Sequence, residues 1–439
     1  MFLFHGILYG NENNNVYNKN WPTWRGPLAT GEALVGNPPV EWNENNNIRW
    51  KIPIPGKGLS TPVIWGDQIF ITTAVSFGKI VNPEKVNGQT KHAMWMRMSG
   101  VSKTTENIQQ FIIYSISRKS GKILWEKIVR EDFPHEGTHK DASWASNSCV
   151  TDGECVIASF GSYGLYCFDL QGTLIWNKDL GDMKIRNSFG EGSSPVLYQN
   201  NVIINWDHEG TSFITVLDKK TGNTIWKKQR DEVTSWSTPI VVEVNEKPQI
   251  IVSASGNSRG YDLASGKVIW KLSGLTKNVI PSPVYSNGMV YLMSGFRGNA
   301  LQAINLNVAK GDLQESPAVV WTFDKNTPYT PSPLLYKGKL YFLRSNNEQL
   351  TCADAKTGKI YYTKQKLDGM KGVYASPVGA KGRVYIVGRN GVCYVIKPGP
   401  VYQVLAKNVL DDGFDASPAI VGNELFLRGL KYLYCIARK

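Results

Sequence analysis

Short apolar runs with tight turns between them fill most of this 439-residue chain. A first apolar strand leads to a turn such as Asn287-Gly288 or Lys337-Gly338, and a second apolar strand follows, as at 289–293 and 340–343. Two apolar strands joined by a tight, Gly-containing turn are the sequence signature of a β-hairpin. The pattern therefore predicts an all-β protein built from antiparallel hairpins.

The hairpins begin at a recurring three-residue opening rich in Ser, Thr and Pro. The openings are Ser60-Thr61-Pro62, Ser146-Asn147-Ser148, Ser193-Ser194-Pro195, Ser237-Thr238-Pro239, Pro281-Ser282-Pro283, Pro331-Ser332-Pro333, Ala375-Ser376-Pro377 and Ala416-Ser417-Pro418. From the second opening onward, their third residues lie 47, 44, 44, 50, 44 and 41 positions apart. A period of about 40–50 residues is typical of the four-stranded blades of a β-propeller.

A second phrase closes most of the repeats. In its full form it reads Asp262-x-x-Ser265-Gly266-Lys267-x-x-Trp270. The Asp accepts backbone hydrogen bonds in the turn and the Gly takes a positive φ, after which the strand returns with an aromatic residue. We expect these aromatic side chains to wedge between neighbouring blades. They are Trp125, Trp176, Trp226, Trp270, Trp321 and Tyr362.

The residue two positions before the Asp is small in each copy, which leaves room for the neighbouring aromatic ring. These small residues are Ser115, Cys167, Val216, Gly260, Ala303, Cys352 and Cys435. Three of the six cysteines are thus explained by packing, and they would lie in different blades, too far apart to form disulfides. No Cys-x-x-Cys occurs, so we expect neither a zinc site nor a redox motif.

The last repeat, residues 416–436, has three predicted strands instead of four. Residues 48–52 look like the end of a repeat whose beginning is missing, because Trp50-Lys51 matches Trp270-Lys271. We predict that 48–52 completes the C-terminal blade and closes a ring of eight four-stranded antiparallel blades, which removes the exposed sheet edge. The expected organisation is a tail over 1–20, an irregular lead over 21–47 that packs on the propeller, and one propeller over 48–437 with an insertion at about 74–110.

The formal net charge is +13, and the excess lysines are scattered through turns without a block of like charges. A solvated cationic surface explains this, and an anionic partner such as a polymer stays open. We expect no specific nucleic-acid recognition, and a monomer. No apolar run approaches the roughly 20 residues of a membrane span. The apolar start, 1–9, is either the remnant of a secretion signal or a frayed tail.

Several motifs resemble the repeats of the pyrroloquinoline quinone (PQQ)-type β-propellers. The Asp-x-x-Thr-Gly-Lys-x-x-Trp phrase is similar to the tryptophan-docking repeat of that family. Segments 21–27 (Trp-Pro-x-Trp-Arg-Gly-Pro), 55–62 (Pro-Gly-Lys-Gly-x-Ser-x-Pro) and 160–166 (Phe-Gly-Ser-x-Gly-Leu-Tyr) are similar to a bacterial subfamily of PQQ-binding-like repeats. The resemblance covers roughly 21–437 and implies an eight-bladed propeller that is exported, hence periplasmic or secreted. Relatives on the same scaffold include quinoprotein dehydrogenases and the propeller lipoprotein of the outer-membrane β-barrel assembly machinery.

Polar and aromatic residues gather in the segments that precede the repeat openings, and in a propeller such segments converge on one mouth of the central channel. We expect them either to form a ligand funnel, with aromatic stacking surfaces and a cation for an anionic group, or to fill the channel mouth without a ligand. These candidate ligand-binding residues are Lys57, His139, Asp141, Trp144, Glu191, Trp236, Asn278, Tyr329, Tyr374 and Asp415.

Two groups of residues raise the question of a metal. His92, Met94, Met96 and Met98 share one face of a strand, which suits Cu(I), although a Met-lined hairpin that covers apolar surface is the simpler interpretation. His135 and His139, with Glu136 and Asp141, have ligand-like spacing but read as a surface loop. We therefore assign no metal site.

Two functions are compatible with these patterns. The first is a non-catalytic binding scaffold of the bacterial cell envelope, whose partner is an envelope protein or an anionic polymer. The second is a quinoprotein-like oxidoreductase, of the alcohol or sugar dehydrogenase type, with a degenerate PQQ site in the channel mouth. The resemblance implies that such enzymes hold PQQ between a vicinal disulfide and a Trp, bind Ca²⁺ through Glu and Asn, and use an Asp as base. This chain has no adjacent cysteines, which favours the first function, with no catalytic residue and no cofactor.

Overall fold

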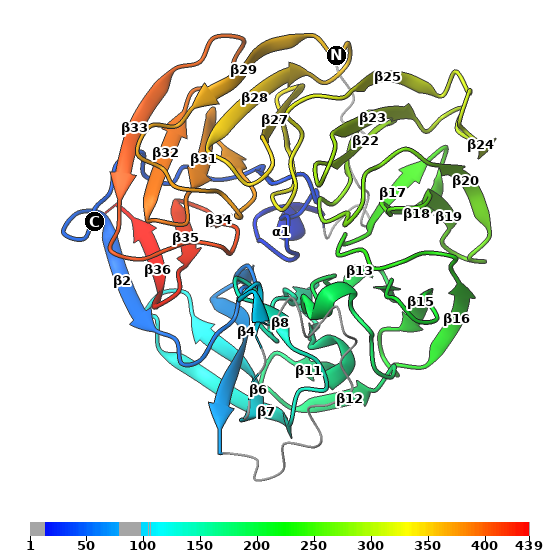
Figure 1. Ribbon diagram of the computed structural model, residues 1–439. Coiled ribbons are helices and arrows are strands. Elements are labelled where there is room, and N and C mark those ends of the chain that lie inside the picture. The colour runs from blue at the N-terminus through cyan, green and yellow to red at the C-terminus, as the bar shows by residue number, and fades with distance from the viewer. Residues whose placement is uncertain (1–13, 79–97, 104, 106, 439) are drawn as a thin grey trace.

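The computed structural model describes residues 14–78, 98–103, 105 and 107–438 of the chain. Eight mainly antiparallel sheets stand around a central axis as the blades of a propeller (Figure 1). The short first strand of each blade lies nearest the axis and the last strand lies at the rim. The predicted all-β, eight-bladed propeller is confirmed.

The blades follow one another around the ring in sequence order. The first four contain β3 (Val63–Trp65), β4 (Gln68–Phe77), β6 (Ile108–Ser117) and β7 (Ile123–Asp132); β9 (Val150–Thr151), β10 (Cys155–Ser159), β11 (Leu165–Asp169) and β12 (Leu174–Lys178); β13 (Val196–Tyr198), β14 (Asn201–Trp206), β15 (Phe213–Asp218) and β16 (Thr224–Gln229); β17 (Ile240–Val244), β18 (Lys247–Val252), β19 (Ser258–Asp262) and β20 (Val268–Leu272). The last four contain β21 (Val284–Ser286), β22 (Met289–Ser294), β23 (Ala300–Asn305) and β25 (Val319–Phe323); β26 (Leu334–Tyr336), β27 (Lys339–Leu343), β28 (Gln349–Asp354) and β29 (Ile360–Lys366); β30 (Val378–Ala380), β31 (Arg383–Val387), β32 (Val392–Ile396) and β33 (Val404–Val409); β34 (Ala419–Val421), β35 (Glu424–Arg428) and β36 (Tyr432–Ala437).

The ring closes where it was predicted to close. Strand β2 (Ile48–Pro53) pairs antiparallel with β36 and places Trp50 opposite Cys435. Figure 1 shows β2, in blue, beside the red β36. The eighth blade is therefore built from both ends of the described chain.

Two blades depart from the expected four strands. The lead contributes β1 (Glu32–Ala33), which pairs parallel with β30, and β24 (Gly311–Asp312) pairs parallel with β20. Both sheets thus have five strands. The cause is the same in each case, since an irregular segment runs alongside a sheet edge and satisfies its backbone groups.

The small residue before each Asp lies directly opposite the aromatic residue of its own blade, as Cys167 does with Trp176 and Val216 with Trp226. Five indoles donate their N–H to a backbone carbonyl of the next blade, at 2.7–3.3 Å. The turn glycine of that blade lies under the ring, and a Cβ on Gly222 would stand 2.8 Å from the indole of Trp176. Trp270 differs, because its indole nitrogen has no hydrogen-bond partner among the described residues. Strand β24 lies beside it instead.

The apolar core lies between blades rather than within one layer. Each hydrophobic cluster combines side chains from neighbouring sheets, as where Ile157 of the second blade and Val202 of the third pack in one group. All six cysteines are buried and free, including the three that the repeat positions explain by packing.

A ring of hydroxyl groups lines the channel and links the blades. In seven places a backbone N–H of one opening donates to the hydroxyl of the next, at 2.9–3.1 Å. We call these acceptors the hydroxyl ring: Ser148, Ser194, Thr238, Ser282, Ser332, Ser376 and Ser417. In the second blade the acceptor is Ser148, the third residue of its opening, whereas in the third to eighth blades it is the second residue. This opening is therefore shifted by one residue from the expected alignment.

The lead crosses one end of the channel. It follows α1 (Asn14–Asn18), which lies inside the ring of blades in Figure 1. Its backbone then bonds to the first, second, sixth, seventh and eighth blades, at Ile64, Thr151, Leu335, Gly379 and Gly422. The lead is therefore a structural part of the propeller and closes this end of the channel.

The remaining elements are short. Strands β5 (Ser102–Lys103) and β8 (Thr138–His139) pair antiparallel, and η2 (Gly161–Tyr163) and η3 (Arg186–Ser188) are single 3₁₀ turns. His92, Met94 and Met96 lie outside the described residues, as does the segment 1–13. In the described part of the chain, no helix has the length and apolar character needed to cross a membrane.

Candidate functional site

A cavity of about 230 Å³ occupies the channel between the lead and the loops that precede the blade openings. Trp24 of the lead forms part of its wall. Seven of the ten candidate residues line it: His139, Asp141, Glu191, Trp236, Tyr329, Tyr374 and Asp415. We call it the channel cavity.

Arg389 organises the charged side of the channel cavity. Its guanidinium bonds to Asp415 at 2.7 and 3.1 Å and to Asp141 at 2.9 Å, and it lies 4.0 Å from the ring centroid of Tyr374. The Tyr374 hydroxyl also donates to Asp141, at 3.1 Å. One cation thus neutralises two carboxylates, one from the loop before the second blade and one from the loop before the eighth.

Burial and pairing act against each other on these groups. Burial alone would raise the pKa of Asp141, but its hydrogen bonds to Arg389 and Tyr374 bring the pKa below its usual value. Burial lowers the pKa of His139, and Asp141 only partly opposes this. Burial, with help from the Asp141 charge, raises the pKa of Tyr374 to about 12. Near neutral pH the cluster therefore holds an ionised Asp141 beside a neutral His139 and a neutral Tyr374.

Glu191 is held in a cradle made by the 160–166 motif. Its carboxylate accepts the backbone N–H of Ser162 at 2.7 Å and the Ser162 hydroxyl at 2.5 Å. A Cβ on Gly161 would stand 1.4 Å from the carboxylate oxygen, and Gly161 has a φ of +59°, so glycine is required there. Burial raises the pKa of Glu191 to about 7, against the hydrogen bonds from Ser162. Glu191 is thus a carboxyl group that takes up and releases a proton near neutral pH.

Trp236 forms part of the aromatic wall and is fixed at both ends. Its indole N–H donates to the carbonyl of Gly190 at 2.7 Å, and its backbone N–H donates to Val279 at 2.8 Å. Phe189 and Tyr329 line the same cavity, and Tyr329 stacks on Phe296 with ring centroids 4.8 Å apart. The wall consists of rigid rings, which suits contact with apolar or aromatic groups.

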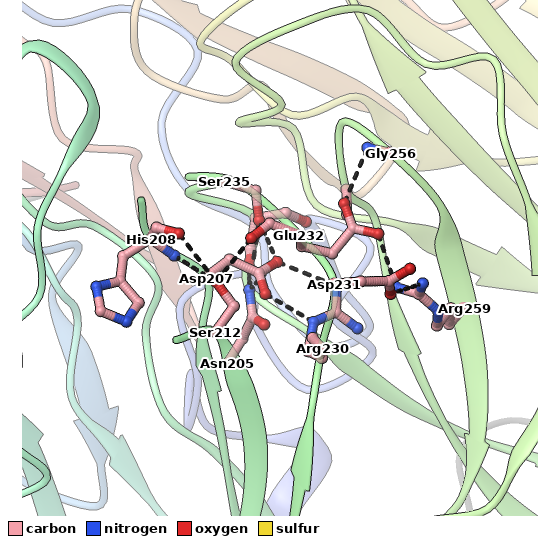
Figure 2. A network of polar contacts seen from close by, with 12 residues as sticks. Asn205, Asp207, His208, Ser212, Arg230, Asp231, Glu232, Ser235, Gly256 and Arg259 are labelled. Carbon is pink, nitrogen blue, oxygen red and sulfur yellow. Dashed lines mark hydrogen bonds and ion pairs between the residues drawn. The ribbon is translucent and has the colours of Figure 1, made fainter. Parts of the chain in front are cut away.

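The loop that carries Trp236 is anchored by a buried polar network between the third and fourth blades (Figure 2). Asp207 accepts from Arg230 at 2.6 and 3.0 Å and from the Ser235 hydroxyl at 2.7 Å, and both members of the ion pair are fully buried. Glu232 accepts from Arg259 at 2.6 Å. The residue next to Trp236 in sequence is therefore tied directly to a buried carboxylate.

Three predicted residues lie away from the lining of the channel cavity. Lys57 is near its rim, with the ammonium 3.0 Å from the carbonyl of Lys140. Trp144 donates to the carbonyl of Glu136 at 3.0 Å and packs behind the wall. Asn278 is buried and interacts with Tyr329. These positions share the loop location that the sequence indicated, but their side chains point elsewhere.

The His135 loop is engaged with protein groups. The two ring nitrogens of His135 bond to the carbonyl of Met183 at 2.8 Å and to the hydroxyl of Tyr163 at 3.1 Å. Within the described residues, no cluster of three or more His, Cys, Asp or Glu side chains is arranged to hold a metal ion. Met98, the one described residue of the group His92, Met94, Met96 and Met98, is exposed and does not lie in a strand.

The residues of the channel cavity do not fit PQQ and its calcium ion as the resemblance implies them. None of the six buried cysteines lines the cavity. The carboxylates of Asp141 and Asp415 are already bonded to Arg389, and that of Glu191 to Ser162, so the donors that a calcium ion would need are taken.

Sequence reasoning missed two residues that shape this site. Arg389 lies in the turn between β31 and β32, where a single Arg among polar residues gives no signal of its own. Trp24 belongs to the lead, which the sequence predicts to pack on the propeller, but no motif indicates that its side chain lies in the channel. A clue existed for Arg389, since two predicted carboxylates converging on one mouth need a cation.

The chain matches the protein family described as outer membrane protein assembly factor BamB over residues 109–305 and 311–399. It is 23% identical over 369 residues to tetrathionate hydrolase of Acidithiobacillus ferrooxidans, over 78% of this chain and 65% of that protein, so less than two thirds of that relative is spanned. It is 21% identical over 327 residues to outer membrane protein assembly factor BamB of Yersinia pestis, over 71% of this chain and 74% of that protein.

Solved structures share the architecture. BamB from Moraxella catarrhalis superposes with a TM-score of 0.55 at 12% identity, over 83% of this chain and 100% of that one. A europium-containing methanol dehydrogenase superposes with a TM-score of 0.52 at 12% identity, over 88% of this chain and 91% of that one. Both likenesses concern the fold. The match of the family across more than half of the residues shows that this chain belongs to the BamB-like family of PQQ-type β-propeller repeat proteins.

Proposed function

We propose that this protein is a non-catalytic binding propeller of the bacterial cell envelope, and that its channel cavity receives part of a partner protein. The observation that carries the proposal is the mutual pairing of the charged groups in the cavity. Asp141 and Asp415 are bonded to Arg389, and Glu191 to Ser162. Paired carboxylates are poor nucleophiles and poor metal ligands, so the aromatic rings are the part of the wall available to a ligand.

The aromatic wall favours a protein partner over an anionic polymer. Trp236, Tyr329 and Tyr374 offer ring faces and edges that suit apolar or aromatic side chains. Trp24 closes the opposite side, so a partner approaches through the loops before the blade openings. Membership of the BamB-like family suggests the cell envelope as the location. The excess positive charge is spread over turns and does not line the cavity. It would attract an anionic partner at long range, and salt would screen that attraction.

Site-specific photo-crosslinking in bacterial cells tests the proposal. A benzoylphenylalanine at Tyr329 should give a covalent adduct with one envelope protein, and Trp236→Ala should reduce that adduct. The same residue placed at the exposed Lys356, in the turn at the other end of β28, serves as the control and should give no such adduct. Equal adducts from both positions would overturn the proposed cavity.

Activity assays test the enzymatic possibility directly. The purified chain would be mixed with PQQ, Ca²⁺, a dye electron acceptor and a panel of alcohols and sugars, and separately with tetrathionate because one relative bears the name tetrathionate hydrolase. We expect no turnover in either assay. Turnover that depends on Asp141 or Glu191 would replace the binding function with a catalytic one.

A further inference from the structure

Arg25 of the lead is buried inside the channel without a carboxylate partner. Its side chain is only 2% exposed, and no described acidic residue forms an ion pair with it. Its Nη2 donates to the carbonyls of Pro333 and Pro377 at 3.0 Å and of Thr30 at 3.3 Å. Neutral carbonyls compensate the cost of burying a guanidinium only in part, because the net charge remains.

The other nitrogens of Arg25 are unpartnered. Nε and Nη1 are buried and have no hydrogen-bond partner among the described residues. A buried donor without an acceptor is energetically unfavourable, and more so when the donor is charged. Guanidinium N–H groups can only donate, so what completes this site must accept hydrogen bonds.

Arg25 also lines a second, small cavity of about 40 Å³ between the lead and the third to fifth blades. The side chains around it include no carboxylate. Two members of the hydroxyl ring, Thr238 and Ser282, line it too. Each accepts a backbone N–H, from Ser194 and from Thr238 respectively, and among the described contacts neither hydroxyl uses its own hydrogen. The polar side chains here thus offer hydrogens and positive charge. The remaining wall includes apolar groups such as Ile240.

We propose that this cavity binds a chloride-sized anion, held by the Arg25 guanidinium and the hydroxyls of Thr238 and Ser282. A cavity needs roughly 10–15 Å³ to hold a water molecule, so this volume suits a monatomic ion and excludes organic anions of cofactor size. The anion neutralises the buried guanidinium and accepts the hydrogens that have no other acceptor. Its structural effect is to fasten the lead to the third, fourth and fifth blades, where the described backbone bonds of the lead are fewest.

Thermal unfolding of the full chain in matched salts tests the anion. Sodium chloride or bromide at 200 mM should raise the melting temperature by about 1–2 °C over sodium gluconate of equal ionic strength, since gluconate is too large to enter. Arg25→Met should lose this difference. The control is Arg428→Met, which removes another buried arginine, one that donates to Ser60 and Thr72. That variant should keep the halide effect.

A second measurement needs no variant, which matters if Arg25→Met fails to fold. Crystals of the unaltered chain grown in bromide should give an anomalous peak in the small cavity beside Arg25. A cavity without that peak, together with equal melting temperatures in chloride and gluconate, would overturn the proposal and leave water as the occupant. A halide effect that persists in Arg25→Met would also overturn it.

Discussion

The indole N–H of Trp50 donates to the backbone carbonyl of Arg118, 3.0 Å away, and so joins the eighth blade to the first. Arg118 in turn pairs with Glu424 of the eighth blade, which also pairs with Arg49 of β2. The seam that closes the ring therefore uses the same aromatic contact as the seams within it, reinforced by a shared carboxylate.

Removal of the closing strand should abolish the cooperative unfolding of the propeller. Deletion of 48–52 leaves β36 as an unpaired edge and frees the first blade from the eighth. The milder Trp50→Ala should lower the free energy of unfolding by about 3 kcal/mol. Urea denaturation followed by circular dichroism measures both, and Trp226→Ala is the matched change inside the ring. A deletion variant with an unaltered melt would contradict closure by β2.

The buried pair behind Trp236 should be costly to break. Asp207→Ala leaves Arg230 as an uncompensated charge in a site without solvent exposure, and we expect a loss of about 3–5 kcal/mol in the free energy of unfolding. The control is Asp368→Ala at the exposed pair with Lys366, which should change stability by less than about 1 kcal/mol. Denaturant titration of both variants makes the comparison. Similar losses would mean that Asp207 and Arg230 are not paired in solution.

Glu191 should make the protein less stable as pH rises through the neutral range. Its folded pKa of about 7 lies above the reference value of 4.5, so the folded state holds the proton more tightly than the unfolded state. Its favourable contribution is complete below about pH 4.5, declines up to about pH 7 and is absent above that, for a total of up to about 3 kcal/mol.

Glu191→Gln cannot titrate and should lack this decline. The measurement is the free energy of unfolding from urea titrations between pH 4.5 and 8, taken as the difference between the variant and the unaltered chain. Glu315→Gln, at an exposed position, is the control and should leave the pH profile unchanged. A profile of Glu191→Gln that runs parallel to that of the unaltered chain would show that the carboxyl is solvated.

The charge of Asp141 should keep the pKa of His139 from falling further. The His139 Nδ1 accepts the backbone N–H of Asp141 at 3.2 Å, and the Asp141 charge is the main opposition to the lowering of the pKa by burial. Asp141→Asn should therefore lower the pKa of His139 further. NMR titration of the His139 ring in the variant and in the unaltered chain measures the shift. An unchanged or higher pKa of His139 would contradict this contact.

Most of the fold could be predicted from the sequence because each repeat contains the same local sequence motifs. The turn glycines, the aromatic residue of the second phrase and the small residue opposite it recur at fixed spacing, so the eight blades and the closing strand could be counted. The fifth strands could not be foreseen. β1 and β24 are two residues long and arise from where irregular segments happen to run.

The channel cavity was only partly predictable. The loop positions of Glu191 and Trp236 follow from the repeat alignment, but the direction of each side chain depends on packing between loops that are distant in sequence. Arg25 illustrates the limit most clearly, because its acceptors at Pro333 and Pro377 are backbone carbonyls more than 300 residues away. Backbone acceptors leave no residue-specific mark in a sequence, so no pattern could have pointed to that contact.

The hydroxyl ring has seven links, and the described contacts include no eighth between Ser417 and Thr61, whose hydroxyl has no partner among the described residues. That position coincides with the seam closed by β2, where Arg428 spans the junction through Ser60 and Thr72. During synthesis the first seven blades can assemble in order, whereas the eighth waits for the last strand to meet one made near the beginning. The ring therefore closes last, at the single junction between β2 and β36. A chain that ends before β36 would remain an open arc of blades.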